Sequence, residues 1–217
     1  MNIPFTDAHT HRIPPPDVQA VPDFSAPELP PPGYDGPFSA GVHPMYAHSA
    51  SIPAAVLEKI RSPRCLAVGE CGFDRRAALS PKEQETLFRT HIELSEELHK
   101  PLIVHCVRMQ PELLRLRASL APSVPWIVHG CRGSEKKLRE LADSGLILSF
   151  GEGLLRDAGM LETFFRILPE NALLIETDES ETALAVLYAA AASYRQMNPD
   201  SFRTLIFQNF RRIFYGE

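Results

Sequence analysis

The sequence predicts a single α/β domain in which parallel strands alternate with helices and close into a barrel. Short apolar runs recur along the chain, each ending in a polar residue and each followed by a helix-length amphipathic segment. Strands that are buried on both faces read as continuous Val, Ile and Leu runs, and their alternation with helices indicates parallel βαβ units. About seven or eight such units in one chain are typical of a closed β/α barrel.

The expected strands follow the apolar runs in chain order. The runs are Ile3–Ala8, Phe38–Val42, Cys65–Gly69, Leu102–Val104, Trp126–Val128, Leu146–Phe150 and Leu173–Ile175. Ser80-Pro81-Lys82-Glu83 is a capping box with proline at the first helical position, and it predicts a helix that ends near His99. Ser134 is the expected N-cap of a helix that ends before Gly145, and Asp200 that of the last helix, which runs through Phe210 and Phe214.

The segment from Pro14 to Gly36 breaks this rhythm. It is rich in proline, which excludes a long helix, and Val18–Val21 is the one short strand expected there. We interpret the segment as an ordered wrap that replaces one helix, so that the barrel is compact or slightly truncated near its second strand. The alternative is a mobile lid over the site.

Composition and charge exclude several classes of protein. Apolar residues make up 44% and charged residues 23% of the 217 residues, as in an average globular domain. The net charge of −5 argues against a protein that grips duplex DNA through a basic face. We see no membrane span, no signal peptide and no CxxC pair among the four cysteines. We therefore expect a cytoplasmic protein with one domain over residues 1–217, and the sequence leaves its oligomeric state open, a monomer included.

Six potential metal ligands lie at, or just past, the ends of the apolar runs. They are His9, His11, Glu70, His105, His129 and Asp178. His9 and His11 are two residues apart near a strand end, so both side chains point to the same face. Because barrel strands end at one rim, we expect these six side chains to converge there.

Imidazole and carboxylate groups suit transition-metal cations such as Zn, Mn, Fe or Ni better than Mg or Ca. Six ligands exceed what one tetrahedral ion needs, whereas two ions bridged by a carboxylate would use them all. Glu70 lies between the other groups in chain order and is the candidate bridge. A single histidine at a strand end has a structural alternative, but six such residues at corresponding points need a shared explanation. We expect two divalent cations, with Zn, Mg and Mn as the candidates.

Other polar residues near the predicted rim are candidates for substrate contacts. We expect His43, in Gly41-Val42-His43-Pro44, to contact the substrate or a ligand side chain. Asp74 could orient a ligand histidine or the substrate, or cap a loop. Arg108 and Arg132 each follow a predicted ligand by three residues, so each guanidinium could clamp a phosphate or form a surface salt bridge. We expect packing roles for Cys71, Cys106 and Cys131, and surface positions for His48, His91 and His99.

These residues resemble those of a known family, the TatD-related metal-dependent hydrolases, which include deoxyribonucleases. The motifs that carry the resemblance occur in the family order, and they are Asp7-Ala8-His9-Thr10-His11, Gly41-Val42-His43-Pro44, Gly69-Glu70-Cys71-Gly72-Phe73-Asp74, Pro101-Leu102-Ile103-Val104-His105, Val128-His129-Gly130-Cys131-Arg132-Gly133, Glu176-Thr177-Asp178 and Asn209-Phe210-Arg211-Arg212-Ile213-Phe214. The resemblance implies a TIM-type barrel with one or two divalent cations and phosphodiester hydrolysis. It further implies that His9, His11 and Asp178 hold the first ion, His105 and His129 the second and Glu70 both, with His43 near the substrate phosphate.

Three departures from the family pattern all lie at the predicted rim. The proline-rich wrap stands where the family has a helix and a fuller strand. The loop after Asp178 is short and lacks the usual arginine- and proline-containing stretch, and the segments after His105 and His129 differ from the usual forms. The metal chemistry therefore carries over more directly than the substrate does.

The expected function is divalent-metal-dependent hydrolysis at single-stranded DNA ends, with 3′-directed exonuclease action as the specific hypothesis. The cations would lower the pKa of a shared water from about 15.7 to near neutrality, and Asp178 would accept its proton. Glu70 and His43 are the other expected catalytic residues. One alternative is a small-molecule hydrolase that acts on an amide, lactone or phosphoester, which the short rim loops favour. The other is a non-catalytic barrel with a structural metal, although such a site needs only four ligands.

Overall fold

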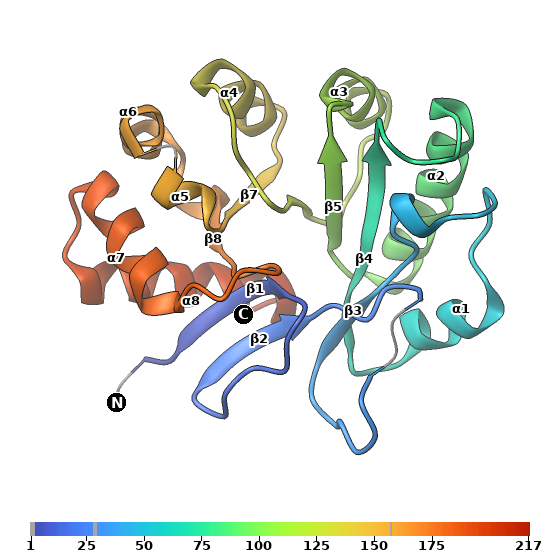
Figure 1. Ribbon diagram of the computed structural model, residues 1–217, viewed down its shortest axis with the longest axis horizontal. Helices are drawn as coiled ribbons and strands as arrows, with labels where there is room; N and C mark the ends of the chain where they lie inside the picture. The colour runs from blue at the N-terminus through green and yellow to red at the C-terminus, as the bar shows by residue number, and fades with distance from the viewer. Residues whose placement is uncertain (1–2, 28–29, 157) are drawn as a thin grey trace. The chain divides into compact units, whose positions relative to one another are not determined.

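The computed structural model describes residues 3–27, 30–156 and 158–217. Parallel strand pairs alternate with helices along the chain, which confirms the α/β class (Figure 1). The chain divides into a terminal part, Met1–Ala20 and Val128–Glu217, and a middle part, Val21–Ile127. The divisions fall inside β2 (Val18–Pro22) and β6 (Trp126–Val128). Every helix among the described residues is too short or too polar to cross a membrane.

The middle part is built on three parallel strands in chain order. These are β3 (Phe38–Ala40), β4 (Cys65–Asp74) and β5 (Leu102–Val107), and Figure 1 shows β4 and β5 side by side and pointing the same way. The helical turn η1 (Pro44–Tyr46) follows β3, and the helices α1 (Ala54–Arg61) and α2 (Pro81–Leu98) pack against β4. The helix α3 (Gln110–Ser119) follows β5 and packs against it.

The helix α2 begins at the predicted capping box. The backbone N–H of Glu83 donates to Ser80 Oγ at 3.3 Å, and the backbone N–H of Ser80 donates to Glu83 Oε2 at 2.9 Å. The helix ends at His99, which adopts a left-handed conformation with φ 53°. Both ends of α2 are therefore as the local sequence predicts.

Aromatic side chains form the centre of the middle part. The Phe88 ring from α2 lies 5.3 Å from the Phe73 ring of β4 and 5.4 Å from the Trp126 ring, both in edge-on geometry. All three side chains are fully buried. Large buried rings dominate the apolar area that a core removes from water, so this group fixes α2 against the strands that carry the site.

The terminal part holds β1 (Phe5–Thr10), β7 (Ile147–Phe150) and β8 (Leu173–Ile175). β7 pairs with β8 in parallel. Beyond the end of β8, the backbone N–H of Asp178 donates to His9 O at 3.0 Å and that of His11 donates to Asp178 O at 3.1 Å, which places this loop alongside β1. The helical elements of this part are α4 (Glu135–Asp143), α5 (Gly153–Arg156), α6 (Ala158–Ile167), η2 (Glu170–Ala172), α7 (Leu184–Arg195) and α8 (Pro199–Tyr215).

The ends of two helices in the terminal part test the capping predictions. Ser134 occupies the predicted N-cap position of α4, but its side chain forms no capping hydrogen bond. The prediction that Asp200 caps the last helix is wrong, because Asn198 is the N-cap and its side chain accepts from the backbone N–H of Asp200 at 2.9 Å. Pro199 then takes the first helical position, where its missing N–H has no consequence.

The part of the proline-rich segment that precedes β3 is hydrogen bonded to that strand. The backbone N–H of Phe24 donates to Ser39 O at 2.9 Å, and that of Ala26 donates to Gly41 O at 3.0 Å. Residues 23–25 are buried. This is the structure of an ordered wrap, as the sequence interpretation favoured, while residues 28 and 29 of the segment lie outside the described residues.

Candidate metal centre

In the terminal part, the side chains of His9, His11 and Asp178 come together. His9 lies on β1 and His11 directly follows its last residue, Thr10, and their ring centroids are 5.0 Å apart. Asp178 Oδ1 lies 3.7 Å from His9 Nε2 and 3.5 Å from His11 Nε2. One potential ligand atom from each residue lies within 4.8 Å of the other two. Two imidazoles and a carboxylate in this arrangement could hold a divalent cation.

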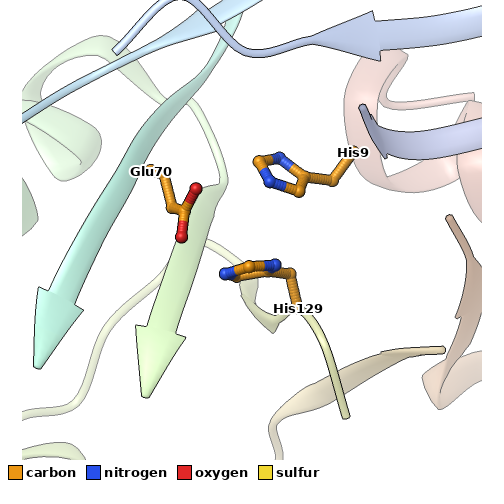
Figure 2. A group of neighbouring side chains, drawn as sticks. All are labelled: His9, Glu70 and His129. Atoms are coloured by element: carbon orange, nitrogen blue, oxygen red, sulfur yellow. The ribbon is translucent and has the colours of Figure 1, made fainter. Parts of the chain in front are cut away.

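His129 belongs to the same part and lies beside this group. It directly follows β6, and its ring centroid is 4.4 Å from that of His9. Figure 2 shows these two imidazoles next to each other. The structure therefore brings four of the predicted ligands of the terminal part into one region, and their roles as ligands stay predictions.

Two buried carboxylates behind these residues had no predicted role. Glu176 is fully buried, accepts from the backbone N–H of Gly130 and lies 3.8 Å from His129 Nδ1. Burial raises the pKa of Glu176, and the nearby His129 and His9 oppose that rise. Asp7 accepts from the backbone N–H of Thr177 at 2.9 Å, and burial raises its pKa to about 7. Their signal in the sequence was their position two residues before a predicted ligand, in Asp7-Ala8-His9 and Glu176-Thr177-Asp178.

In the middle part, His43, Glu70 and His105 form a second group. Glu70 Oε1 lies 2.6 Å from His105 Nδ1 and 3.1 Å from His43 Nε2, and the two histidine atoms are 3.3 Å apart. The backbone N–H of Met45 donates to His43 Nδ1 at 3.1 Å, so His43 presents Nε2 to the group. His43 was predicted to contact the substrate. In the structure its Nε2 is as favourably placed to act as a metal ligand as His105 Nδ1 is.

Glu70 lies in the middle of β4, at a bulge. The prediction that the strand ends at Gly69 is wrong, because β4 continues to Asp74. Val68 pairs with Leu102 and Cys71 with Val104, so β4 carries one extra residue between these pairs. Gly69 has φ 133°, and a Cβ there would lie 2.3 Å from the carbonyl oxygen of Ile103. Glycine at this position therefore permits the bulge, which re-aims the Glu70 side chain.

Asp74 holds the far side of the His105 ring. Its Oδ2 lies 3.0 Å from His105 Nε2 and accepts from Arg76 Nη2 at 2.8 Å, and its Oδ1 accepts from the backbone N–H of Arg76 at 2.8 Å. Burial alone would raise the pKa of Asp74, but the hydrogen bonds from Arg76 and His105 lower it below its usual range. A carboxylate that accepts from one imidazole nitrogen leaves the other as the electron-pair donor, so Asp74 prepares His105 Nδ1 for a cation.

The prediction that His91 is a surface residue is wrong. Its side chain is fully buried in α2, where Nε2 accepts from the backbone N–H of Val42 at 3.0 Å and Nδ1 donates to Leu87 O at 2.9 Å. Burial lowers the pKa of His91 to about 4, so the ring is neutral. It supports the loop that carries His43. His48 and His99 are exposed, as predicted.

Both predicted phosphate-binding arginines are exposed. Arg108 follows β5 with φ 56°, and Arg132 follows His129 by three residues. Among the described residues neither guanidinium forms a salt bridge, in contrast to Arg76 on Asp74.

The cysteines near the predicted ligands are packed inside the protein: Cys71 and Cys131 are buried and Cys106 is half-buried. Burial raises the pKa of Cys71, and it raises the pKa of Cys106 to about 12. Both side chains therefore stay thiols.

Both groups fit a divalent cation by the chemistry of their donors. Each combines two or more imidazoles with a carboxylate. The nitrogen–oxygen distances to Asp178 in the first group, 3.5 and 3.7 Å, are longer than a hydrogen bond, whereas those to Glu70 in the second group, 2.6 and 3.1 Å, are hydrogen-bond distances. Burial of such groups is unfavourable unless a charge or a hydrogen bond compensates it, and a cation would supply that charge.

Comparisons with known proteins show the family of the chain and its fold. The family model described as TatD related DNase matches residues 34–215. The 3′-5′ ssDNA/RNA exonuclease TatD of Klebsiella pneumoniae is 33% identical over 152 residues, which cover 67% of this chain and 58% of that protein. This chain thus spans little more than half the length of that relative. The crystal structure of the TatD homologue YjjV from Escherichia coli has a TM-score of 0.75 at 20% identity and 99% coverage of both chains. The phosphotriesterase homology protein of Escherichia coli, solved with phosphate in its active site, has a TM-score of 0.69 at 12% identity, with 97% of this chain and 99% of that chain covered.

Proposed function

Because the chain belongs to the TatD-related DNase family, we propose that it is a divalent-metal-dependent phosphodiesterase that removes nucleotides from the 3′ end of single-stranded nucleic acid. The observation that carries the proposal is the pair of histidine and carboxylate groups, His9–His11–Asp178 and His43–Glu70–His105. The name of the Klebsiella pneumoniae relative supports the polarity and the substrate. The net charge of −5 favours short contacts at a strand end over tracking along a long backbone.

The proposal assigns all six predicted ligands to one pair of cations. His9, His11 and Asp178 would hold the first, His105 and His129 the second, and Glu70 would bridge them. This assignment requires the strands to close into a TIM-type barrel within one domain. The parallel order β3-β4-β5 in the middle part supports a barrel-like arrangement of parallel strands, as do the parallel β7-β8 pair and the hydrogen bonds between the Asp178 loop and β1 in the terminal part.

The chemistry follows from where each side chain could act. Bound divalent cations, with Zn, Mg and Mn as candidates, would lower the pKa of a water and withdraw charge from the phosphoryl oxygens. Asp178, which is partly exposed, would accept the proton of the attacking water. Arg108 and Arg132 would bind the non-bridging phosphate oxygens, and His43 would lie against the scissile phosphate.

A second candidate function is hydrolysis of a small phosphoester, amide or lactone. The observation that favours it is the short connection after Asp178, because only residues 179–183 separate it from α7. A short rim loop offers little surface to a polymer. The fold likeness to the phosphotriesterase homology protein is compatible with either substrate.

The experiment follows a 5′-labelled single-stranded oligonucleotide, in both DNA and RNA forms, with Mn, Mg or Zn added to chelator-treated protein. We expect a ladder that shortens from the 3′ end and a loss of about 100-fold or more in Asp178→Asn. His48→Ala, a change at an exposed histidine, is the matched control and should keep full activity. Turnover of lactones or amides alone would replace the nuclease proposal by the second candidate. Cation binding without turnover of any substrate would indicate a non-catalytic metal protein.

A further inference from the structure

The ordered wrap delivers a buried carboxylate to the backbone of Glu70. Asp23 follows β2 and pairs with Ser39 of β3, and its side chain is 2% exposed. Its Oδ1 accepts from the backbone N–H of Glu70 at 2.9 Å. None of the family-like motifs of the sequence includes Asp23, which lies in the segment where this chain departs from the family pattern.

Three further donors surround the same carboxylate. Ser39 Oγ donates to Asp23 Oδ1 at 2.8 Å and Ser25 Oγ donates to it at 2.9 Å, while the backbone N–H of Ser25 donates to Oδ2 at 3.1 Å. Ser25 and Ser39 are themselves buried. A buried carboxylate is tolerated when its oxygens accept several hydrogen bonds, and those bonds are stronger than bonds between neutral groups. Asp23 is thus held in place by four hydrogen bonds.

The bulge in β4 explains why Glu70 needs such an acceptor. The extra residue of a bulge does not take part in the regular ladder, so its backbone N–H must find another partner. The Glu70 N–H lies 2.9 Å from Asp23 Oδ1 and 2.5 Å from Ser25 Oγ, and the Glu70 carbonyl oxygen lies 3.4 Å from Ser25 Oγ. The wrap therefore contacts both polar backbone atoms of the residue whose side chain reaches His43 and His105.

We propose that Asp23 is a positioning residue, which fixes the backbone of Glu70 and thereby the direction of its carboxylate toward the cations. The inference rests on the proposed function, in which Glu70 is the shared ligand. Asp23 acts on Glu70 directly, through the bond from the Glu70 N–H to Oδ1, and indirectly, by holding the Ser25 side chain that contacts the same backbone. In this chain the wrap thus takes part in building the site rather than covering it.

The test is the substitution Asp23→Asn, which keeps the shape of the side chain but replaces one acceptor edge by a donor. Co²⁺ is titrated into chelator-treated protein, with its visible absorption spectrum reporting ligand geometry and calorimetry reporting affinity. We expect Co²⁺ binding about 10-fold or more weaker than in the unchanged protein, with an altered spectrum. The kcat on the oligonucleotide should fall while KM stays within about two-fold, because the substrate contacts remain.

Ser39→Ala is the matched control, since it removes one hydrogen bond from the same oxygen but none from Glu70. It should lower the thermal midpoint and leave Co²⁺ affinity and spectrum unchanged. If Asp23→Asn does not fold, Ser25→Ala removes the other acceptor of the Glu70 N–H and should weaken Co²⁺ binding about five-fold.

Three results would overturn the inference. In the first, folded Asp23→Asn binds Co²⁺ with the affinity and spectrum of the unchanged protein. In the second, Ser39→Ala weakens binding as much as the change at Asp23 or Ser25, which would mean general loss of stability. In the third, the unchanged protein itself binds no Co²⁺, and that result refutes the proposed function as well. The titration of the unchanged protein therefore distinguishes failure of the proposed function from failure of the inference about Asp23.

Discussion

The substitution Asp74→Asn would show how strongly the site depends on the orientation of His105. The Asp74 carboxylate is buried, lies 3.0 Å from His105 Nε2 and accepts from the Arg76 side chain at 2.8 Å. Asparagine has the same shape, but its amide nitrogen donates, so one edge can no longer accept from either partner. His105 then loses the carboxylate that holds Nε2 as the donor and leaves Nδ1 for a cation.

Two estimates of the effect agree. Loss of a carboxylate behind a metal-binding histidine lowers cation affinity about 10- to 100-fold. A hydrogen bond to a charged group is worth about 1.5–3 kcal/mol, which is again about 10- to 100-fold in a binding constant. The Arg76 side chain is 59% exposed, so solvent screens its pair with Asp74 and the pair contributes little. Arg76→Ala should therefore weaken cation binding by no more than about five-fold.

Calorimetric titration of chelator-treated protein with Zn²⁺ or Mn²⁺ compares the unchanged protein, Asp74→Asn and Arg76→Ala. Thermal unfolding of the cation-free forms separates an effect on the site from an effect on the fold. The reasoning is refuted if Asp74→Asn binds within about three-fold of the unchanged protein, or if Arg76→Ala reproduces its loss. Either result would mean that His105 needs no oriented proton on Nε2.

Three further predictions concern the residues around the site. Phe88→Ala should lower the free energy of unfolding by about 3–5 kcal/mol in denaturant titrations, because the ring is fully buried, and a loss below about 1 kcal/mol would contradict the described core. The lowered pKa of His91 means that the unfolded chain takes up a proton before the folded one, so stability should fall by about 3 kcal/mol as the pH drops from about 6.5 to about 4. A variant His91→Gln should lose that dependence, and an unchanged slope would exclude His91 as its source. Tyr46 is 57% exposed beside His43, so Tyr46→Ala should raise KM for single-stranded DNA about 10-fold through lost base stacking, with kcat unchanged; equal KM values would rule out that contact.

Local sequence signals predicted much of the fold. The apolar runs gave β6 and β8 at their observed bounds, β3 and β7 with small differences at their ends, and the first half of β5. The capping box at Ser80 gave the first turn of α2. These features depend on neighbouring residues, because burial on both faces and a cap are properties of a few consecutive positions. The family resemblance added the order of the site motifs, and the family assignment is confirmed.

Features that depend on contacts between distant segments were missed. The continuation of β4 through Glu70 depends on the close approach of Gly69 to Ile103, which the sequence of β4 alone does not reveal. The burial of His91 depends on the backbone N–H of Val42, 49 residues earlier. The contact of Asp23 with Glu70 spans 47 residues and lies in a segment whose prolines suggested only an irregular path. Each case pairs a polar group with a partner that only the fold supplies.

The measurement that tests the central claim most directly is an anomalous-scattering map of crystals grown with Mn²⁺. Two peaks are expected, with Glu70 bonded to both, His9, His11 and Asp178 around one, and His105 and His129 around the other, each at about 2.0–2.3 Å. Peaks that do not share Glu70, or no peak at any of these six side chains, would contradict the shared cation pair and the hydrolysis built on it.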